Sequence, residues 1–284
     1  MNFEASVIAP VAVAAAWYAW GTHRRPLRLV GGRRPLPDLW RPAAFYTGLA
    51  AILAALVLLD SAADELFWAH MVQHGLLMLV AAPLLVLGAP WLPFWRPLPI
   101  GFRRAVAGTI VTSPRLRGLR SVARATARPL TAWILFNGDL ALWHVPWLYD
   151  LTLANTAVHY TEHASFIGFG MLFWAQVLDS PPFHPGLDHL RRALYVTAGA
   201  IASWVLAVVL ALAPSPLYGA YASRHARPGG ISALSDQQLA GGVMWGPGSI
   251  TYGLIVFWAI YRWLDEEEPK RGRRPSRRVA ARSL

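Results

Sequence analysis

Apolar residues occur along this chain in windows of about 20, each bounded by charged residues, prolines or glycines. A helix needs roughly 20 mostly apolar residues to cross a bilayer. We therefore expect an all-α polytopic membrane bundle of about seven transmembrane helices. The windows run approximately from Phe3 to Gly21, Pro42 to Leu59, Glu65 to Gly88, Pro129 to Trp143, Asn155 to Leu178, Ala193 to Ala213 and Gln237 to Leu264.

The composition agrees with a membrane protein. Of the 284 residues, 55% are hydrophobic and only 14% are charged, whereas a soluble chain usually carries about a quarter charged residues. The mean hydropathy of +0.37 points the same way. Cysteine is absent, which excludes disulfides, thiolate metal sites and cysteine nucleophiles. A metal ion would have to be held by histidine, methionine or carboxylate groups.

The positive charge is distributed asymmetrically between the connections. The formal net charge of +11 raises the alternative of a nucleic-acid binder. However, all but Arg224 and Arg227 of the 26 lysines and arginines lie on alternate connections or in the C-terminal tail. By the positive-inside rule, this distribution predicts an N-terminus outside and a C-terminus inside. Because the arginines flank the spans rather than forming one patch, we expect no nucleic-acid partner.

We expect a single transmembrane domain over residues 1–264. The first window is interpreted as a span rather than a cleaved signal peptide, because Glu4 precedes it and His23-Arg24-Arg25 follows it. The connection 89–128 mixes aromatic residues with arginines, which predicts one or two helices on the cytoplasmic membrane surface. An irregular basic loop is the alternative, since prolines interrupt the pattern. The tail 265–284 is expected to be a disordered, basic cytoplasmic segment.

Two of the predicted spans contain paired histidines. Ionisable groups inside a span are costly, roughly 2.5 to 3.5 kcal/mol for an aspartate at mid-helix. The third span contains His70-Met71-Val72-Gln73-His74, and the fifth contains His159-Tyr160-Thr161-Glu162-His163. Two histidines four residues apart share one helix face and can bind a single ion. Gln73 and Glu162 are placed to ligate that ion or to orient an imidazole.

The predicted topology puts these polar residues at one depth. The third and fifth spans run in the same direction, so all four histidines fall in the outer half of the membrane. Asp139 and His144 approach that level on the fourth span, and Asp236 and Met244 do so on the seventh. We expect a metal or cofactor site formed by His70, His74, His159 and His163, with Gln73, Asp139, His144, Glu162, Asp236 and Met244 as further ligands or supporting residues.

The fifth-span motif also matches the His-x-x-Glu-His signature of inverted zinc peptidases. Such an enzyme needs a further carboxylate ligand downstream. The later glutamates, 266–268, lie in the predicted cytoplasmic tail, on the other side of the membrane. A peptidase is therefore disfavoured, and we expect no enzymatic activity.

The ordered set of motifs resembles a known family. From roughly Phe45 to Trp263, the chain is similar to the CtaG family, the multi-spanning assembly factors of caa3-type cytochrome c oxidase. These differ from the single-span copper chaperone that shares the name in other bacteria. The resemblance rests on the stretch from His70-Met71-Val72-Gln73-His74 to Ala82-Pro83-Leu84-Leu85-Val86-Leu87-Gly88, on Trp143-His144-Val145-Pro146-Trp147 followed by His159 and Glu162-His163, and on Asp236-Gln237-Gln238-Leu239-Ala240-Gly241-Gly242-Val243-Met244-Trp245.

The resemblance implies a multi-pass protein of the bacterial plasma membrane that helps to mature the oxidase by handling copper. Its expected partners are the lipid bilayer, oxidase subunit II or I, and a periplasmic or extracellular copper donor. Copper would be held by imidazoles, with assistance from Met244. Zinc or haem at the same site stays open. The alternatives to an assembly factor are a haem-binding electron carrier and a copper transporter.

Overall fold

A computed structural model describes residues 3–24, 40–224 and 227–272, and these residues form helices and no strands. The prediction of an all-α fold is confirmed. Two parts of the chain lie outside the described residues. One is the stretch 25–39, which contains Arg25, Arg28, Arg33 and Arg34 of the first connection predicted to be inside. The other is the end of the predicted tail, 273–284.

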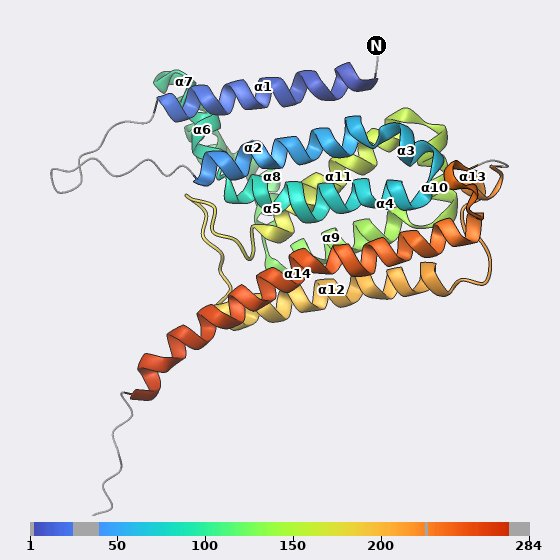
Figure 1. The fold of residues 1–284 in the computed structure, drawn as a ribbon. Helices are drawn as coiled ribbons and strands as arrows, with labels where there is room; N and C mark the ends of the chain where they lie inside the picture. Colours follow the sequence, from blue (N-terminus) through green and yellow to red (C-terminus); the bar gives the residue numbers. More distant parts are fainter. Residues whose placement is uncertain (1–2, 25–39, 225–226, 273–284) are drawn as a thin grey trace, which may run out of the picture.

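Seven helical runs of the described residues correspond to the seven apolar windows and lie side by side (Figure 1). The helix α1 begins at the same end of the bundle as α3, α10 and α13, and α14 leaves at the opposite end. The runs are α1 (Phe3–His23), α2 with the π-turn η1 (Trp40–Leu53, Ala54–Leu58), α4 with the π-turn η2 and α5 (Phe67–Gly75, Leu76–Ala81, Ala82–Leu87), α9 (Pro129–Trp143), α11 (Thr156–Trp174), α12 (His189–Leu212) and α14 (Ala233–Gly272).

Five of these runs are long and apolar enough to cross a membrane: Ala5–His23, Trp40–Leu58, Phe67–Leu87, His189–Leu212 and Ala233–Glu268. The helix α9 has only 15 residues, about 22 Å at 1.5 Å per residue. The helix α11 has 19 residues, but the polar histidine motif lowers its hydropathy. The chain has the character of a membrane protein, while the count of seven spans stays a prediction.

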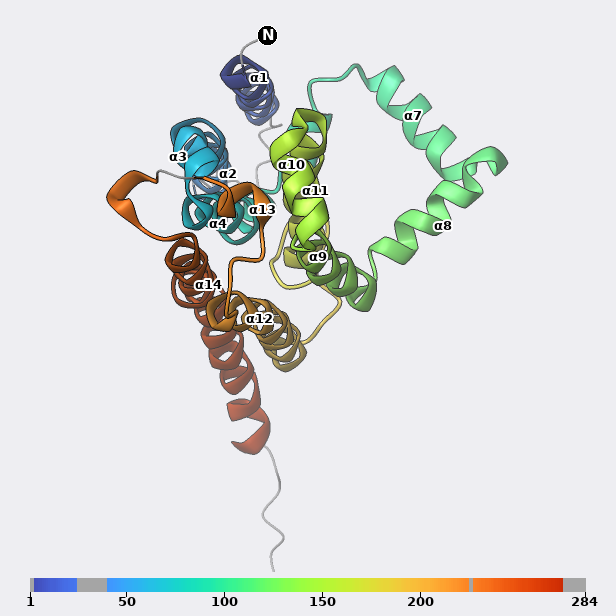
Figure 2. The same ribbon diagram turned by 90° about the vertical axis from the view of Figure 1, so that its right-hand side faces the viewer.

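Short helices close the two ends of the bundle (Figure 1). At one end lie α3 (Asp60–Glu65), α10 (Pro146–Ala154) and α13 (Gly219–Ala222), and the turn η4 (Pro228–Gly230) precedes α14. The connection 89–128 leaves from the other end and is helical. It contains α6 (Trp91–Trp95), α7 (Ile100–Thr112), the turn η3 (Pro114–Leu116) and α8 (Arg117–Thr126). Helices α7 and α8 bury no residue and form an arm that projects from the bundle (Figure 2).

The helix α14 continues past Leu264 to Gly272, into the segment for which we predicted disorder. Charged side chains stabilise this extension. Arg262 lies 3.9 Å from Asp265, one helical turn away, and His189 of α12 lies 2.9 Å from Glu266. The acidic run was expected to begin a disordered tail, but its first residues are paired with neighbours of the bundle.

The π-turn η1 lies between α2 and α3. Within it, the backbone N–H of Leu59 donates to the carbonyl of Ala54, five residues earlier, so the carbonyl of Ala55 has no helical donor. The side-chain amide of Gln73 on α4 donates to that carbonyl at 2.8 Å. Gln73 thus satisfies a buried backbone group on the neighbouring helix and fixes how the two helices align.

The π-turn η2, between α4 and α5, also leaves one backbone carbonyl without a helical donor, and a side chain of α11 donates to it. The N–H of Ala82 donates to the carbonyl of Leu77, and the following residue, Pro83, has no N–H to offer. The carbonyl of Met78 is therefore left without a helical donor, and the indole N–H of Trp174 donates to it at 2.8 Å. In each of the two π-turns, one side chain from another helix thus donates to the carbonyl that lacks a helical donor.

The helices α12 and α14 pack against each other through small residues. At Gly241 an added Cβ would lie 2.7 Å from the carbonyl oxygen of Ala207, so only glycine allows this approach. Large apolar side chains face outward, as in a membrane bundle. Leu130, Leu212 and Phe257 are 71%, 77% and 73% exposed, respectively, while histidine, glutamate and aspartate side chains lie inside.

Candidate metal centre

Helices α4 and α11 bring the two histidine pairs face to face. His70, His159, Glu162 and His163 each offer one ligand atom, and these atoms all lie within 4.8 Å of one another. His70 and Glu162 are fully buried, and His74 and His163 are 3% exposed. We call His70, His74, His159, Glu162 and His163 the His/Glu group.

The carboxylate of Glu162 lies beside both histidines of α4. Its Oε2 is 3.9 Å from Nε2 of His70, and its Oε1 is 3.6 Å from Nε2 of His74. Across the two helices, the ring centroids of His70 and His159 are 5.3 Å apart, and those of His74 and His163 are 5.8 Å apart. Imidazole nitrogens and a carboxylate at these spacings are donors that suit zinc, copper, iron or nickel.

Many polar atoms of the group have no hydrogen-bond partner. Buried polar groups are nearly always hydrogen-bonded, and each unsatisfied one costs about 1 to 3 kcal/mol. A concentration of such atoms at one point fits a site whose partner is an ion. Those without a partner among the described residues are Nε2 of His70, both ring nitrogens of His74, Nε2 of His159, both carboxylate oxygens of Glu162 and both ring nitrogens of His163.

Tyr221 sets the ring orientation of His70. Nδ1 of His70 lies 3.1 Å from the Tyr221 hydroxyl, which itself donates to the carbonyl of Ala63 at 2.6 Å. Burial raises the pKa of the Tyr221 phenol above its ordinary value, so the hydroxyl keeps its single proton. With that proton used, the hydroxyl accepts from Nδ1–H, and the lone pair of Nε2 is directed to the His/Glu group.

Asp139 lies next to the group rather than in it. One of its oxygens accepts from the indole N–H of Trp143 and the other from the hydroxyl of Ser165, both at 2.9 Å. The Ser165 hydroxyl also lies 2.8 Å from the backbone carbonyl of Glu162. Asp139 is therefore connected to the backbone of α11 through one serine, with both of its oxygens engaged.

Asp236 and Gln73 hold the helix that carries the first histidine pair. The two oxygens of Asp236 accept from the backbone N–H groups of Phe67 and Trp68 at 3.0 Å each, and so cap the N-terminus of α4 from α14. Gln73 binds the carbonyl of Ala55 as described above. Both residues position α4, and neither joins the His/Glu group.

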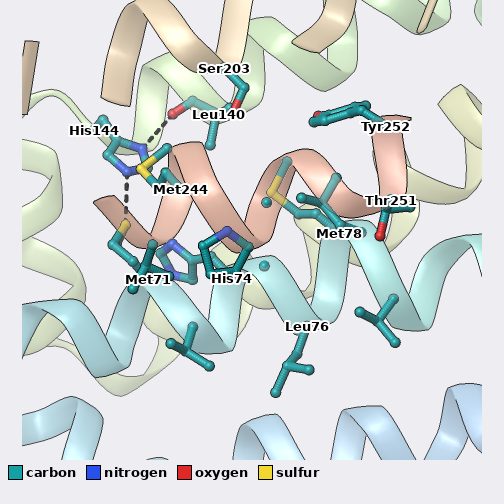
Figure 3. A pocket seen from close by; sticks show the side chains of 17 residues that line it. Met71, His74, Leu76, Met78, Leu140, His144, Ser203, Met244, Thr251 and Tyr252 are labelled. Carbon is teal, nitrogen blue, oxygen red and sulfur yellow. Dashed lines mark hydrogen bonds between the residues drawn. The ribbon is translucent and has the colours of Figure 1, made fainter. Parts of the chain in front are cut away.

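His144 and Met244 line a cavity of about 180 Å³ beside the group, into which His74 also faces (Figure 3). The ring centroids of His144 and His74 are 6.1 Å apart. Of the residues expected from the sequence, the structure thus gathers four within 4.8 Å of one another, with His74 beside them at 3.6 Å from Glu162, and places His144 and Met244 at a neighbouring cavity.

Tyrosines that surround the group were missed by sequence reasoning. Tyr149, Tyr218 and Tyr221 form a buried aromatic cluster with Phe67, and the ring of Tyr149 lies 5.4 Å from that of His70. Tyr218 directly precedes α13 and Tyr221 lies in this four-residue helix, in a segment that has no hydrophobic periodicity. Only their neighbourhood in space connects them with the histidines.

Comparison with known proteins gives one match. The model of the family described as cytochrome c oxidase caa3 assembly factor (Caa3_CtaG) matches residues 16–266, which is most of the chain and includes every residue of the site. The resemblance inferred from the motifs is thereby confirmed. The chain matched no curated protein and no solved structure.

Proposed function

The chain belongs to the cytochrome c oxidase caa3 assembly factors, and from that membership we propose that it binds copper at the His/Glu group and hands it to the oxidase. The protein acts as a non-catalytic metal carrier inside the bacterial plasma membrane. It receives copper from an outer donor and passes it to oxidase subunit II or I. The single observation that carries the proposal is the set of buried, unpartnered ligand atoms within 4.8 Å of one another.

The donor chemistry supports copper. Imidazole binds both oxidation states of copper, and the chain has no cysteine that would favour a thiolate site. Glu162 contributes the negative charge that offsets part of the charge of a buried cation. Asp139 lies close to the group and adds to the negative potential there, although its oxygens are engaged by Trp143 and Ser165.

The arrangement of the bundle supports an outer location. The His/Glu group lies on α4 and α11, and its histidines fall in the first half of the helical run Phe67–Leu87 and in the first half of α11. The arginine-rich α7–α8 arm leaves from the opposite end of the bundle, which the positive-inside rule assigns to the cytoplasm. Copper bound at the group is therefore close to the outer face, where an outer donor and a client domain outside the membrane can reach it.

The proposal is tested by the copper content of the full-length protein purified in detergent. We expect about one copper ion per chain at the His/Glu group after loading with Cu(II) and desalting. His74→Ala and His163→Ala should each abolish this binding while leaving membrane insertion intact. His184→Ala is the matched control, because His184 is 71% exposed and pairs with Asp179 far from the group. Unchanged copper in the His74→Ala/His163→Ala double variant contradicts the proposal.

The same preparation distinguishes the alternatives. A Soret band in the purified protein would identify a haem site, and zinc in place of copper would appear in the elemental analysis. Copper uptake into proteoliposomes would favour transport. We expect neither a Soret band nor uptake. The ring of Phe166 lies 4.6 Å from that of His74 and belongs to a buried apolar cluster with Phe136 and Trp174, which offers an ion no polar path inward.

A further inference from the structure

The cavity beside the His/Glu group is lined by an unusual concentration of soft donors (Figure 3). It has a volume of about 180 Å³ and lies between α4, η2, α9, α12 and α14. Most of its wall is aliphatic, but Met71, Met78 and Met244 bring three thioethers to it, and His74 and His144 bring two imidazoles. The chain has only five methionines in all, and three of them line this one cavity.

The ring of His144 is held with its lone pair toward this cavity. Its Nδ1 lies 2.8 Å from the carbonyl oxygen of Leu140, and a carbonyl only accepts, so Nδ1 carries the proton. In the neutral imidazole, Nε2 is then an acceptor with a free lone pair. Charging the ring would be costly, because His144 is 6% exposed and pairs with no carboxylate among the described residues.

Nε2 of His144 faces a second acceptor. It lies 3.3 Å from Sδ of Met71, and a thioether sulfur has no proton to donate. With the neutral imidazole, the two lone pairs point at the same space and no hydrogen bond joins them. Two donor atoms 3.3 Å apart can share one cation whose bonds to nitrogen and sulfur are about 2.0 to 2.3 Å long.

Met244 supplies a third donor. It lines the same cavity from α14 and packs against the buried cluster that contains Met71. Thioether and imidazole ligands select soft ions such as copper(I). We propose that Met71, His144 and Met244 form a second metal site, specific for a soft monovalent cation and separate from the His/Glu group.

The two sites are neighbours that differ in chemistry. The His/Glu group combines imidazoles with a carboxylate, whereas the second site has two thioethers and no charged ligand. His74 belongs to both surroundings, since it lines the cavity and lies 3.6 Å from Glu162. The second site would thus hold copper(I) next to the His/Glu group, with the imidazole of His74 adjoining both sites. This inference rests on the proposed function for the identity of the cargo as copper.

Silver(I), which is soft, monovalent and redox-inert, is the probe for the second site. Ag(I) is titrated into the full-length protein in detergent, and the His/Glu group is followed separately by the electron paramagnetic resonance signal of bound Cu(II). We expect Met71→Leu and Met244→Leu to weaken Ag(I) binding by at least about tenfold each, with the Cu(II) signal unchanged. X-ray absorption of the Ag(I) protein should show sulfur neighbours that the double variant lacks.

Met171→Leu is the matched control, because Met171 lines a different cavity with Phe45 and Leu85. An unchanged Cu(II) signal also shows that each variant is folded. The inference is overturned if the double variant binds Ag(I) as the parent does, or if the Ag(I) protein has no sulfur neighbours. Methionine-dependent Ag(I) binding without any Cu(II) site would support the second site and contradict the proposed function. Cu(II) binding at the His/Glu group without methionine-dependent Ag(I) binding would contradict the second site alone.

Discussion

Tyr221 orients His70 of the metal centre and is not itself one of the proposed ligands. Its hydroxyl proton is used on the carbonyl of Ala63, so the oxygen can only accept from Nδ1 of His70. The short helix α13 that carries it is itself held in place, because Asp150 accepts from the backbone N–H groups of Gly219 and Ala220 at its start. These hydrogen bonds fix α13 and, through Nδ1, the ring of His70, whose other nitrogen, Nε2, faces the His/Glu group.

Replacing Tyr221 by phenylalanine should weaken metal binding. Without the hydroxyl, Nδ1 of His70 loses its partner and the ring is free to adopt the other tautomer. We expect copper affinity to fall by about tenfold or more, as for other residues that orient a ligating histidine, with the stoichiometry retained at high copper. Competition with a chelator measures the change.

The control for this variant is Tyr195→Phe. The hydroxyl of Tyr195 is buried without a hydrogen-bond partner in the described structure and lies on α12. Equal copper affinity in Tyr221→Phe and Tyr195→Phe would mean that the orientation of His70 does not depend on Tyr221.

At the scale of the elements, the position of α4 is set from two directions. Asp236 caps its N-terminus from α14, and Gln73 ties its middle to the π-turn of the second predicted span. Because the residues that fix α4 lie on other helices, the histidines it carries are held to a defined place relative to α11. This is the rigid support that a preorganised metal site requires.

Gln73→Leu should lower stability and leave metal binding in place. The variant keeps the size of the side chain but leaves the carbonyl of Ala55 unsatisfied, which costs about 1 to 3 kcal/mol. We expect a lower thermal unfolding midpoint in detergent and an unchanged copper content at saturation.

Gln176→Leu is the comparison for that experiment. Its amide donates to the carbonyl of Leu172, four residues earlier in the same segment, and joins no two helices, so we expect a smaller loss. A complete loss of copper in Gln73→Leu, with the fold retained, would make Gln73 a ligand rather than a tie between helices.

At the scale of the whole molecule, the two ends of the bundle differ in charge and in structure. One end carries the short helices α3, α10 and α13 that cover the His/Glu group, and the other carries the α7–α8 arm with its arginines (Figures 1 and 2). A basic arm without buried residues fits a surface that meets anionic lipid headgroups. We therefore predict an orientation with α3, α10 and α13 outside.

The absence of cysteine allows this orientation to be tested directly. Ser215→Cys, between α12 and α13, and Ser121→Cys, on α8, each introduce one exposed thiol. In intact cells, an impermeant maleimide should label the first variant and not the second, and permeabilisation should expose both. Labelling of Ser121→Cys in intact cells would reverse the predicted orientation.

Much of the fold follows from local sequence. Each apolar window corresponds to one helical run, because the length of an apolar run is a property of consecutive residues. The histidines and carboxylates inside the apolar windows also predicted the site, because ionisable groups within a span are costly and are usually functional. The end of α14 was predicted too early because its stabilising partner, His189, is far away in the sequence.

The sequence by itself determined that this is a helical membrane protein with two histidine pairs, each spaced four residues apart on a helix, because spacing and hydropathy are local quantities. Only the tertiary structure decided what each polar residue does. Asp236 caps α4 from α14, Gln73 joins two helices, and Tyr221 contacts His70. None of these contacts follows from spacing in the sequence. The physical reason is that hydrogen bonds and metal contacts depend on distances of about 2 to 4 Å between atoms, and helix packing sets those distances.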